Sequence, residues 1–390
     1  MSPSRYDVAI VGAGPAGAAT AIALLQRGFS VALLERTRCG DAAENIAEGA
    51  NPRRPRAWSP GEGLSAIAQS ALQELGQWQA FQQQGHRPSY LTQSAWGSDE
   101  LRDRYAISHK LGPDYHLDRP RFDEWLRRRA AAAGADLFDA TQVERATWLA
   151  AGCFELCCSR ALPSSGAARE EFALEAAHIV DATGRSAALL RKFGGVRQQV
   201  DDLVCVGRCY DETVFEPSIL VETAANGWWY SSPLPDRSAL ALYFTRAALA
   251  RRTRSEQDFQ ATLAQTTHLA RRFASATRAG PIRFCAAAPV KSTWPSELPL
   301  LPVGDAAAAF DPIAGSGLCF AFRSALEAAS VLDDARAGRG IWFAGYQQGV
   351  GNVFDQHVRR RRELYAHEKR WPGSEFWARV ARVANVQREA

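Results

Sequence analysis

The sequence lacks several features that would mark whole classes of protein. No apolar run approaches the roughly 20 residues that a helix needs to cross a bilayer, so we expect no membrane span. The eight cysteines contain no Cys-x-x-Cys pair and the seven histidines show no metal-ligand spacing. We therefore expect buried free thiols, no metal site and a cytoplasmic location. The first residues enter a predicted strand directly, so we also expect no signal peptide.

Lysine is scarce, because it occurs only at positions 110, 192, 291 and 369, whereas arginine is abundant. The formal net charge is only +4 over 390 residues. Arginine clusters occur at 53–56, 127–129 and 359–362, and two of the three lie in predicted helices beside acidic residues. Solvated helix faces explain them better than a nucleic-acid surface does, so we expect no nucleic-acid partner.

A nucleotide-binding pattern stands near the start of the chain. An apolar strand from Tyr6 runs into a Gly-x-Gly-x-x-Gly turn, which precedes a helical stretch at 18–25 and a second strand at 30–35. This order is typical of a βαβ dinucleotide fold, although a lone glycine-rich turn also occurs in ordinary α/β proteins. Glu35 ends the second strand where a carboxylate binds a ribose, which favours FAD or NAD over NADP. The predicted cofactor-binding residues here are Gly12, Gly14, Pro15, Ala16, Gly17, Glu35 and Arg36.

Two later segments complete the pattern. An apolar strand at 177–181 ends in Asp181-Ala-Thr-Gly184-Arg185, and Gly304-Asp305 precedes Asp311-Pro312-Ile-Ala-Gly315-Ser316-Gly317. The glycine-rich turn at 12–17 and the segment at 304–317 together indicate FAD. We expect an α/β fold in which a Rossmann-like FAD-binding domain carries an inserted antiparallel β-sheet substrate domain and C-terminal helices.

The expected boundaries interleave the two domains. FAD-binding parts are placed at 1–88, 119–202 and 296–335, substrate-domain parts at 89–118 and 203–295, and the C-terminal helices at 336–390. Strands are expected around 90–98 and as a meander at 137–179, and Asp118 is expected to cap a helix that begins near Arg119. Further helices are expected at 64–75, 255–275, 317–334, 340–366 and 374–387.

With the three motifs in this order, the chain resembles the single-component flavoprotein monooxygenases and their relatives, the tryptophan halogenases and geranylgeranyl reductases. The resemblance implies that Asp305 holds the ribityl hydroxyls of FAD and that Arg119 reaches its phosphates. It also implies that the turn formed by Pro312, Gly315, Ser316 and Gly317 offers backbone N–H groups to the flavin. Asp181 and Gly184 are further cofactor-binding candidates.

The halogenase branch fits less well than the family as a whole. Tryptophan halogenases carry a Gly-Trp-x-Trp-x-Ile-Pro signature and an active-site lysine, whereas this chain reads Gly227-Trp-Trp-Tyr-Ser-Ser-Pro233. The strand at 89–97 that should supply the lysine contains none. We therefore place halogenation last among the candidate activities.

Other stretches resemble the halogenase-like flavoproteins that mature quinone cofactors by oxygenating a tryptophan on a partner protein. They are 61–64, 95–98, 115–119 and 368–377. Residues 38–60 match no pattern, and they bear on the substrate entrance. The substrate is therefore left as an aromatic small molecule or a tryptophan-bearing partner polypeptide.

The catalytic candidates are His116, Glu62, Trp228 and Tyr230. Trp228, Trp229 and Tyr230 either wall the substrate cavity over the flavin or form an ordinary aromatic sheet core, and Trp96 presents the same choice. His116 could serve as a base near the flavin, but a histidine before a helix is often structural. Glu62 could also be a first-turn carboxylate favoured by a helix dipole.

The leading function is an FAD-dependent monooxygenase acting on an aromatic substrate with O2. No second nucleotide fingerprint is present, so NAD(P)H visits transiently or reduced flavin comes from outside. Two alternatives are kept open: a small-molecule hydroxylase or ene-reductase of secondary metabolism, and a non-enzymatic FAD-binding scaffold.

Overall fold

A seven-stranded mixed sheet forms the first half of the molecule. The computed structural model describes residues 3–38, 62–106, 110–162, 168–211, 218–235, 238–276, 278–339 and 343–378. Strand β1 lies between β2 and β11, both parallel to it, and β8 and β20 extend the parallel part. Strands β9 and β10 join antiparallel, as the meander prediction requires. The bounds are β1 Ser4–Val11, β2 Val31–Leu34, β8 Asp136–Phe138, β9 Thr141–Trp148, β10 Phe154–Ala161, β11 Arg169–Asp181 and β20 Leu300–Pro302.

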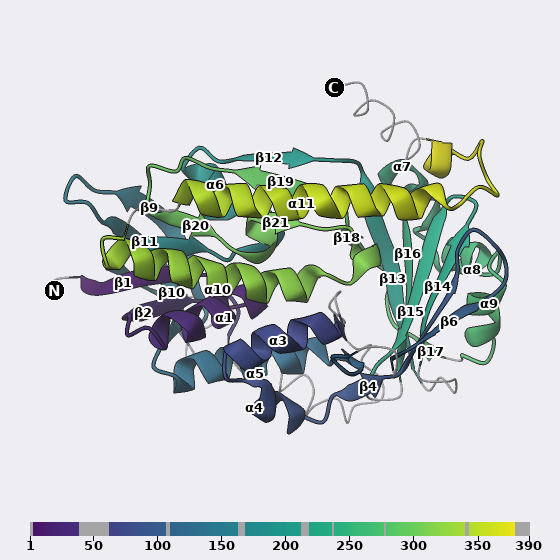
Figure 1. Cartoon of the computed structure of the whole chain (residues 1–390), viewed down its shortest axis with the longest axis horizontal. Helices are drawn as coiled ribbons and strands as arrows, with labels where there is room; N and C mark the ends of the chain where they lie inside the picture. Colours follow the sequence, from purple (N-terminus) through teal and green to yellow (C-terminus); the bar gives the residue numbers. More distant parts are fainter. Residues whose placement is uncertain are drawn as a thin grey trace.

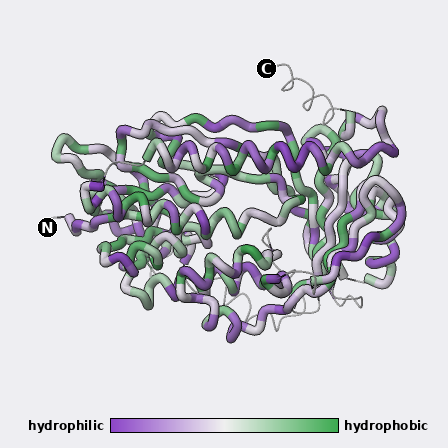
Figure 2. The backbone as a smooth tube through the Cα atoms, in the orientation of Figure 1, coloured by the Kyte–Doolittle hydropathy of each residue, from purple (hydrophilic) through white to green (hydrophobic). Residues whose placement is uncertain are grey.

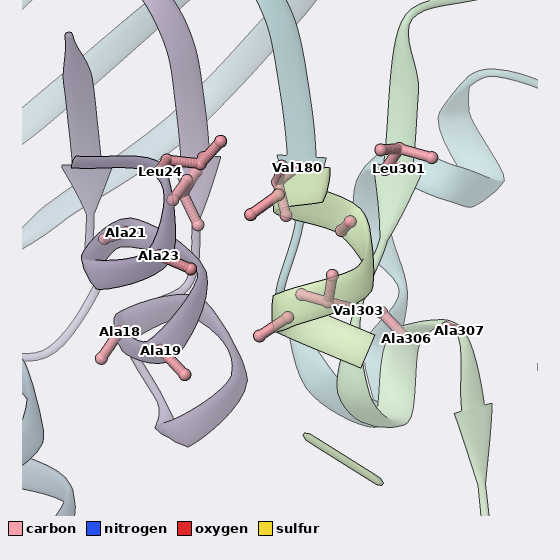
Figure 3. Close-up of a cluster of buried hydrophobic side chains, with 14 of the residues drawn as sticks. Ala18, Ala19, Ala21, Ala23, Leu24, Val180, Leu301, Val303, Ala306 and Ala307 are labelled. Atoms are coloured by element: carbon pink, nitrogen blue, oxygen red, sulfur yellow. The ribbon is translucent and has the colours of Figure 1, made fainter. Parts of the chain in front are cut away.

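Helix α1 (Pro15–Leu25) packs closely between this sheet and α10 (Gly317–Arg336). Its buried face is built largely from alanines, which lie opposite Val180, Val303 and Ala306 in Figure 3. Small side chains let the helix approach the sheet, so its N-terminus stands directly beyond the end of β1. Three further helices belong to this half: α3 (Ala66–Glu74), α4 (Trp78–Gln82) and α5 (Arg119–Ala132).

The second half is an eight-stranded sheet that is antiparallel except where β5 pairs with β14. Successive residues point to opposite faces: Leu240, Leu242 and Phe244 join one apolar cluster, while Ala241 and Tyr243 join another. Helices α8 (Glu256–Leu263) and α9 (His268–Arg272) supply the second cluster with Phe259 and Leu269. The strands are β5 Leu91–Ala95, β6 Arg102–Tyr105, β13 Leu203–Asp211, β14 Ile219–Ala224, β15 Gly227–Pro233, β16 Ala239–Arg246, β17 Arg278–Ala279 and β18 Arg283–Ala286.

Two three-stranded sheets and one long helix lie between the halves. One small sheet contains β12 (Val196–Gln199), β19 (Val290–Thr293) and β21 (Ala308–Ala309). The other contains β3 (Gly63–Leu64), β7 (Asp114–His116) and β4 (Arg87–Ser89). Helix α11 (Phe343–Ala366) runs along the first half and reaches the large antiparallel sheet (Figure 1). Many of its residues are hydrophilic (Figure 2).

The helix expected at 255–275 is wrong, because the structure has two short helices there, α8 (Glu256–Leu263) and α9 (His268–Arg272). The carboxylate of Glu222 accepts the backbone N–H groups of Thr267, His268 and Leu269, which starts a new helix after a break. This cap comes from a distant strand, so no local pattern predicts it.

Other helices match more closely. Helix α3 begins at Ala66 rather than Leu64, because Asp114 accepts its first N–H and Leu64 belongs to β3. Helix α10 extends two residues past the predicted end, and Asp118 caps α5 through the N–H of Arg121, as expected. Residues 375–378 are helical, and the rest of the helix expected to 387 lies outside the described residues. No helix in the described ranges has the length and apolarity to cross a membrane.

Candidate functional site

The first glycine-rich turn leaves no room for side chains at two positions. Gly12 has φ +103°, and a Cβ there would lie 2.3 Å from the carbonyl oxygen of Ala182. A Cβ on Gly17 would lie 1.9 Å from the carbonyl oxygen of Gly12. At Gly14 no atom of the described residues lies within 4 Å of a Cβ, so the space in front of the α1 N-terminus is open. Pro15 and Ala16 occupy the first turn of the helix, where free N–H groups point outward.

Glu35 fixes this turn from the end of β2. Its carboxylate accepts the N–H of Ala13 at 2.8 Å and both the N–H and the hydroxyl of Thr37. Burial alone would raise the pKa of Glu35, but the hydrogen bonds from Thr37 and Ala13 outweigh it and hold the pKa below its ordinary value. Arg36 follows as an exposed residue at the same edge of the sheet.

Asp305 lies in a short 3-10 turn, Gly304–Ala306, directly after β20. Arg185 Nε is 3.6 Å from its carboxylate, and Arg197 donates to its backbone oxygen at 2.8 Å. Desolvation raises the pKa of Asp305, while Arg185, Arg197 and Arg119 oppose that shift. The side chain still has 40% of its surface open, so the carboxyl is recessed but accessible.

Asp181 is committed to the protein itself. Its carboxylate is fully buried and accepts the N–H and hydroxyl of Thr183 and the N–H of Leu190. Those bonds hold the turn in which Gly184 has φ +64°. Arg185, the next residue, donates to the carbonyl of Ala288 at 2.8 Å. Asp181 therefore positions the turn and with it the guanidinium of Arg185.

The turn after Asp311 combines exposed backbone with a buried polar atom. Pro312–Ala314 forms a 3-10 turn, and Gly315 follows with φ +57°. No atom of the described chain lies within 4 Å of a Cβ placed on Gly315 or Gly317. Ser316 Oγ is buried without a hydrogen-bond partner among the described residues. This cradle lies ahead of the N-terminus of α10 and could hold the edge of a planar group that needs hydrogen-bond donors.

Arg119 is electrostatically linked to two acidic positions of the site. Its guanidinium makes two hydrogen bonds to Asp123, at 3.0 and 3.1 Å. Burial works against its charge, but Asp123 first, and then Glu62 and Asp305, raise the pKa of Arg119 above the ordinary arginine value. A single cation therefore lies within electrostatic reach of both the recessed aspartate and the buried Glu62.

Three of the four catalytic candidates meet in one buried network. His116 Nδ1 is 2.9 Å from Ser232 Oγ, and Ser232 and Glu62 both interact with the hydroxyl of Tyr230. Burial, and then the charge of Glu62, raise the pKa of Tyr230 well above its usual value. Burial lowers the pKa of His116 to about 4, assisted by the charges of Arg87 and Arg272. His116 is therefore neutral at pH 7. The burial that keeps it neutral also opposes the positive charge that it would gain as a base.

The aromatic residues divide between the two faces of β15. Trp229 is fully buried against Tyr243 and Phe259 on the face that α8 covers, which supports the second of its two expected roles, an ordinary aromatic sheet core. Strand alternation is the reason, because Trp228 and Tyr230 point the other way. Trp228 stacks on Phe244 at 4.0 Å, is 1% exposed and donates its Nε1 hydrogen to Tyr365 at 2.7 Å.

Trp96 also behaves as a packing residue. It donates to the backbone oxygen of Leu364 at 2.9 Å and contacts the rings of Tyr365 and Trp377. Gly61 and residues 39–60 lie outside the described residues. Among the described residues no group of His, Cys, Asp or Glu could hold a metal ion.

Sequence reasoning missed Ser232, Arg185, Arg197 and Tyr365. Ser232 could have been found from its i+2 relation to Tyr230 on a strand, which places both on one face. Arg185 directly follows the Asp-Ala-Thr-Gly motif and could have been included with it. Arg197 and Tyr365 reach the site from elements far away in the chain, and no local pattern marks them.

Known proteins share both sequence and fold with this chain. A model of FAD-dependent oxidoreductases matches residues 7–119, and LodB of Marinomonas mediterranea, named as an FAD-dependent oxidoreductase, is 28% identical over 96% of each chain. The solved structure of CmlS, a flavin-dependent halogenase, has a TM-score of 0.80 at 22% identity, covering 100% of this chain and 70% of that one.

A third relative in structure is QhpG, a peptidyl tryptophan dihydroxylase, with a TM-score of 0.67 at 24% identity over 97% of this chain and 79% of that one. These likenesses establish the flavoprotein fold. A model of the tryptophan halogenase family matches residues 72–388, most of the chain. The protein therefore belongs to the tryptophan halogenase family of FAD-dependent oxidoreductases.

Proposed function

We propose that the protein is an FAD-dependent monooxygenase that hydroxylates an aromatic, tryptophan-like substrate, with a tryptophan side chain of a partner polypeptide as the favoured form. The observation that carries the proposal is the buried network of Glu62, Tyr230, Ser232 and His116, which contains no lysine. Likeness to LodB along nearly all of both chains supports the family branch, and the fold shared with QhpG, named as acting on peptidyl tryptophan, supports the substrate class.

The proposed cofactor site places FAD between the two glycine-rich turns. Gly12, Gly14, Pro15, Ala16 and Gly17 would hold the pyrophosphate at the α1 N-terminus. Glu35 already accepts three hydrogen bonds, so it would orient the turn and keep only residual acceptor capacity for the ribose, with Arg36 at the rim.

The remaining cofactor contacts come from the other segments. Asp305 would accept the ribityl hydroxyls, and Arg119 would reach the phosphates. Pro312, Gly315, Ser316 and Gly317 would offer the flavin their backbone cradle, in which the free hydroxyl of Ser316 would gain a partner. Asp181 and Gly184 would act indirectly, through the turn they build. When bound, FAD supplies the electron transfer and oxygen activation that hydroxylation requires.

On the substrate side, Glu62 is the group that can move a proton. Its carboxylate could accept a hydrogen bond from the N–H of an indole or the O–H of a phenol. That bond would increase the electron density of the ring that is to be hydroxylated. Tyr230 would relay or hold the proton through its bond to Glu62. Neutral His116 would fix the hydroxyl of Ser232 rather than act as the base. Trp228 would shape the wall from behind, since almost none of its surface is open.

The placement of lysine separates hydroxylation from halogenation. The family resemblance gives halogenases an active-site lysine, whereas Lys291 here pairs with Asp355 and Lys110 and Lys369 are exposed. Lys192, the fourth, ends the short helix α6 (Ala188–Lys192). Because none of the four takes part in the network, the group that would hold an oxidised halide is missing.

The test is a product analysis with several substrates in parallel. FAD-loaded protein is reduced by NADH, NADPH or externally reduced flavin, and then mixed with oxygen, halide and L-tryptophan, indole or tryptophan-bearing peptides. A peptide mass gain of one or two oxygen atoms on the tryptophan supports the proposal. Oxygen on a free small molecule alone would favour the small-molecule hydroxylase, and incorporation of chlorine or bromine would overturn the hydroxylase assignment. The productive reductant identifies the electron donor.

A further inference from the structure

One face of α11 carries three polar side chains that converge on a single aspartate. His357, Arg361 and Tyr365 are four residues apart, so they lie on the same side of the helix. The backbone N–H of Asp311 donates to His357 Nε2 at 3.1 Å, and Arg361 Nε donates to the Asp311 carboxylate. The hydroxyl of Tyr365 donates to the same carboxylate oxygen at 2.9 Å. Asp311 has no exposed surface, so its orientation is set by this stripe.

Asp311 in turn controls the glycine-rich turn that follows it. Its other carboxylate oxygen accepts the N–H of Ile313 at 3.0 Å and so caps the turn at Pro312–Ala314. Gly315 then reverses the chain with φ +57°, and α10 begins at Gly317. A rotation of the Asp311 side chain would therefore tilt the backbone N–H groups that face the open cradle.

The stripe also reaches the substrate half. Tyr365 Oη accepts the Nε1 hydrogen of Trp228, a residue of β15, at 2.7 Å. Arg361 additionally pairs with Asp201, where the chain crosses from the first half to β13. Trp228 is held by its stack on Phe244, and Tyr230, two residues on, belongs to the proposed catalytic network. A continuous series of buried contacts thus joins β15 to the turn.

We propose that Tyr365 is a positioning residue that fixes the flavin-facing turn relative to the substrate sheet. Its hydroxyl donates to Asp311 and accepts from Trp228 at once, so both bonds depend on one oxygen. In a buried setting such bonds are strong, and losing the shared atom leaves the indole N–H of Trp228 without its acceptor and the carboxylate of Asp311 with one donor fewer. The inference needs FAD binding but not any particular substrate, so it stands or falls separately from the proposed hydroxylation.

The test compares Tyr365→Phe with Tyr243→Phe. Both remove the hydroxyl of a buried tyrosine, but that of Tyr243 donates to the backbone oxygen of Asn226 on the opposite side of the sheet. FAD titration of the apoproteins should show about tenfold weaker binding for Tyr365→Phe and less than twofold change for Tyr243→Phe. The flavin absorbance spectrum and midpoint potential should shift only in Tyr365→Phe, while apoprotein melting temperatures fall alike.

Unchanged FAD affinity, spectrum and potential in Tyr365→Phe would overturn the proposal. If that variant does not fold, Trp228→Phe provides the second test, because it removes the indole donor to Tyr365 and keeps an aromatic ring against Phe244. A spectral shift there, with FAD binding weakened about threefold, supports the coupling, since a single hydrogen bond is lost. A Trp228→Phe protein with the spectrum and affinity of the parent would show that β15 and the turn are independent.

Discussion

The two halves of the molecule build their proposed ligand sites by different means. The cofactor half relies on backbone: Gly12 and Gly17 are so tightly enclosed that a single methyl group would collide with main-chain oxygens. The substrate half relies on buried side chains, with Glu62, Tyr230 and His116 linked through hydroxyl groups. A site made of backbone tolerates no added atom, whereas a site made of side chains tolerates a change of shape better than a change of charge.

The largest effect should come from Gly12→Ala. A positive φ of +103° and a contact of 2.3 Å with Ala182 both oppose a side chain. We expect the free energy of unfolding to fall by at least about 2 kcal/mol and FAD to be lost. Denaturant unfolding and flavin absorbance after desalting measure both quantities.

Gly14→Ala is the matched control. Its methyl group would enter open space, so the apoprotein should keep its stability within about 0.5 kcal/mol while FAD binding weakens. A Gly12→Ala protein with parental stability and bound FAD would contradict the backbone account of the cofactor half.

Asp305→Ala should have the next largest effect, confined to the cofactor. Removing a recessed carboxylate that accepts hydroxyl groups should weaken FAD binding by about 2 kcal/mol, roughly 30-fold. Equilibrium dialysis or fluorescence titration gives the dissociation constant of FAD. The control variant Asp355→Ala, which removes the exposed partner of Lys291, should leave this constant unchanged. Full flavin occupancy in Asp305→Ala would remove this residue from the cofactor site.

Glu62→Gln tests the side-chain half of the comparison. The substitution keeps the shape but removes the charge, so hydroxylated product should fall by about 10²-fold while FAD stays bound. Product formation is followed by mass spectrometry and occupancy by absorbance. Equal turnover in the two proteins would mean that Glu62 is structural. Loss of FAD as well would mean that the two halves are less separate than their geometry indicates.

At pH 7 the smallest effect concerns His116, whose influence on stability grows only as the pH falls. Burial lowers the pKa of His116 to about 4. As the pH falls below about 6.5, the unfolded chain therefore binds a proton at His116, whereas the folded protein does not bind it until the pH approaches 4. The resulting stability is present above about pH 6.5 and is lost as pH falls toward 4, up to about 3 kcal/mol. His116→Gln should therefore flatten the dependence of unfolding free energy on pH between those values. An identical slope in parent and variant would show that His116 is protonated in the folded protein.

The sequence predicted the cofactor half well because its determinants are local. The glycines of the first turn, the Asp118 cap and the start of α10 at Gly317 each depend on residues within a few positions. Turn chemistry and capping act over such distances, so they are visible in a single stretch of chain.

The substrate half was less predictable because its partners are distant in sequence. Glu222 breaks the helix expected at 255–275 from a strand more than 40 residues away. Trp228 and Trp229 are adjacent and chemically identical, and only the pairing of β15 decides which one faces Tyr365. The sequence predicted Glu62, His116 and Tyr230 as catalytic candidates. Ser232, which lies between them, was found only from the geometry of strand β15.

The parallel pairing of β5 with β14 has a consequence for synthesis of the protein. Thr92 lies beside Ile219, so β5 leaves the ribosome on the order of ten seconds before its neighbour, at usual rates of about 5–20 residues per second. Trp96 waits longer still for Leu364, which is 268 residues further along. Throughout that interval the nascent chain exposes one unpaired edge of β5, which has only β6 beside it, and an uncovered indole. Yield of the native protein should therefore depend on chaperones that shield this segment until α11 emerges.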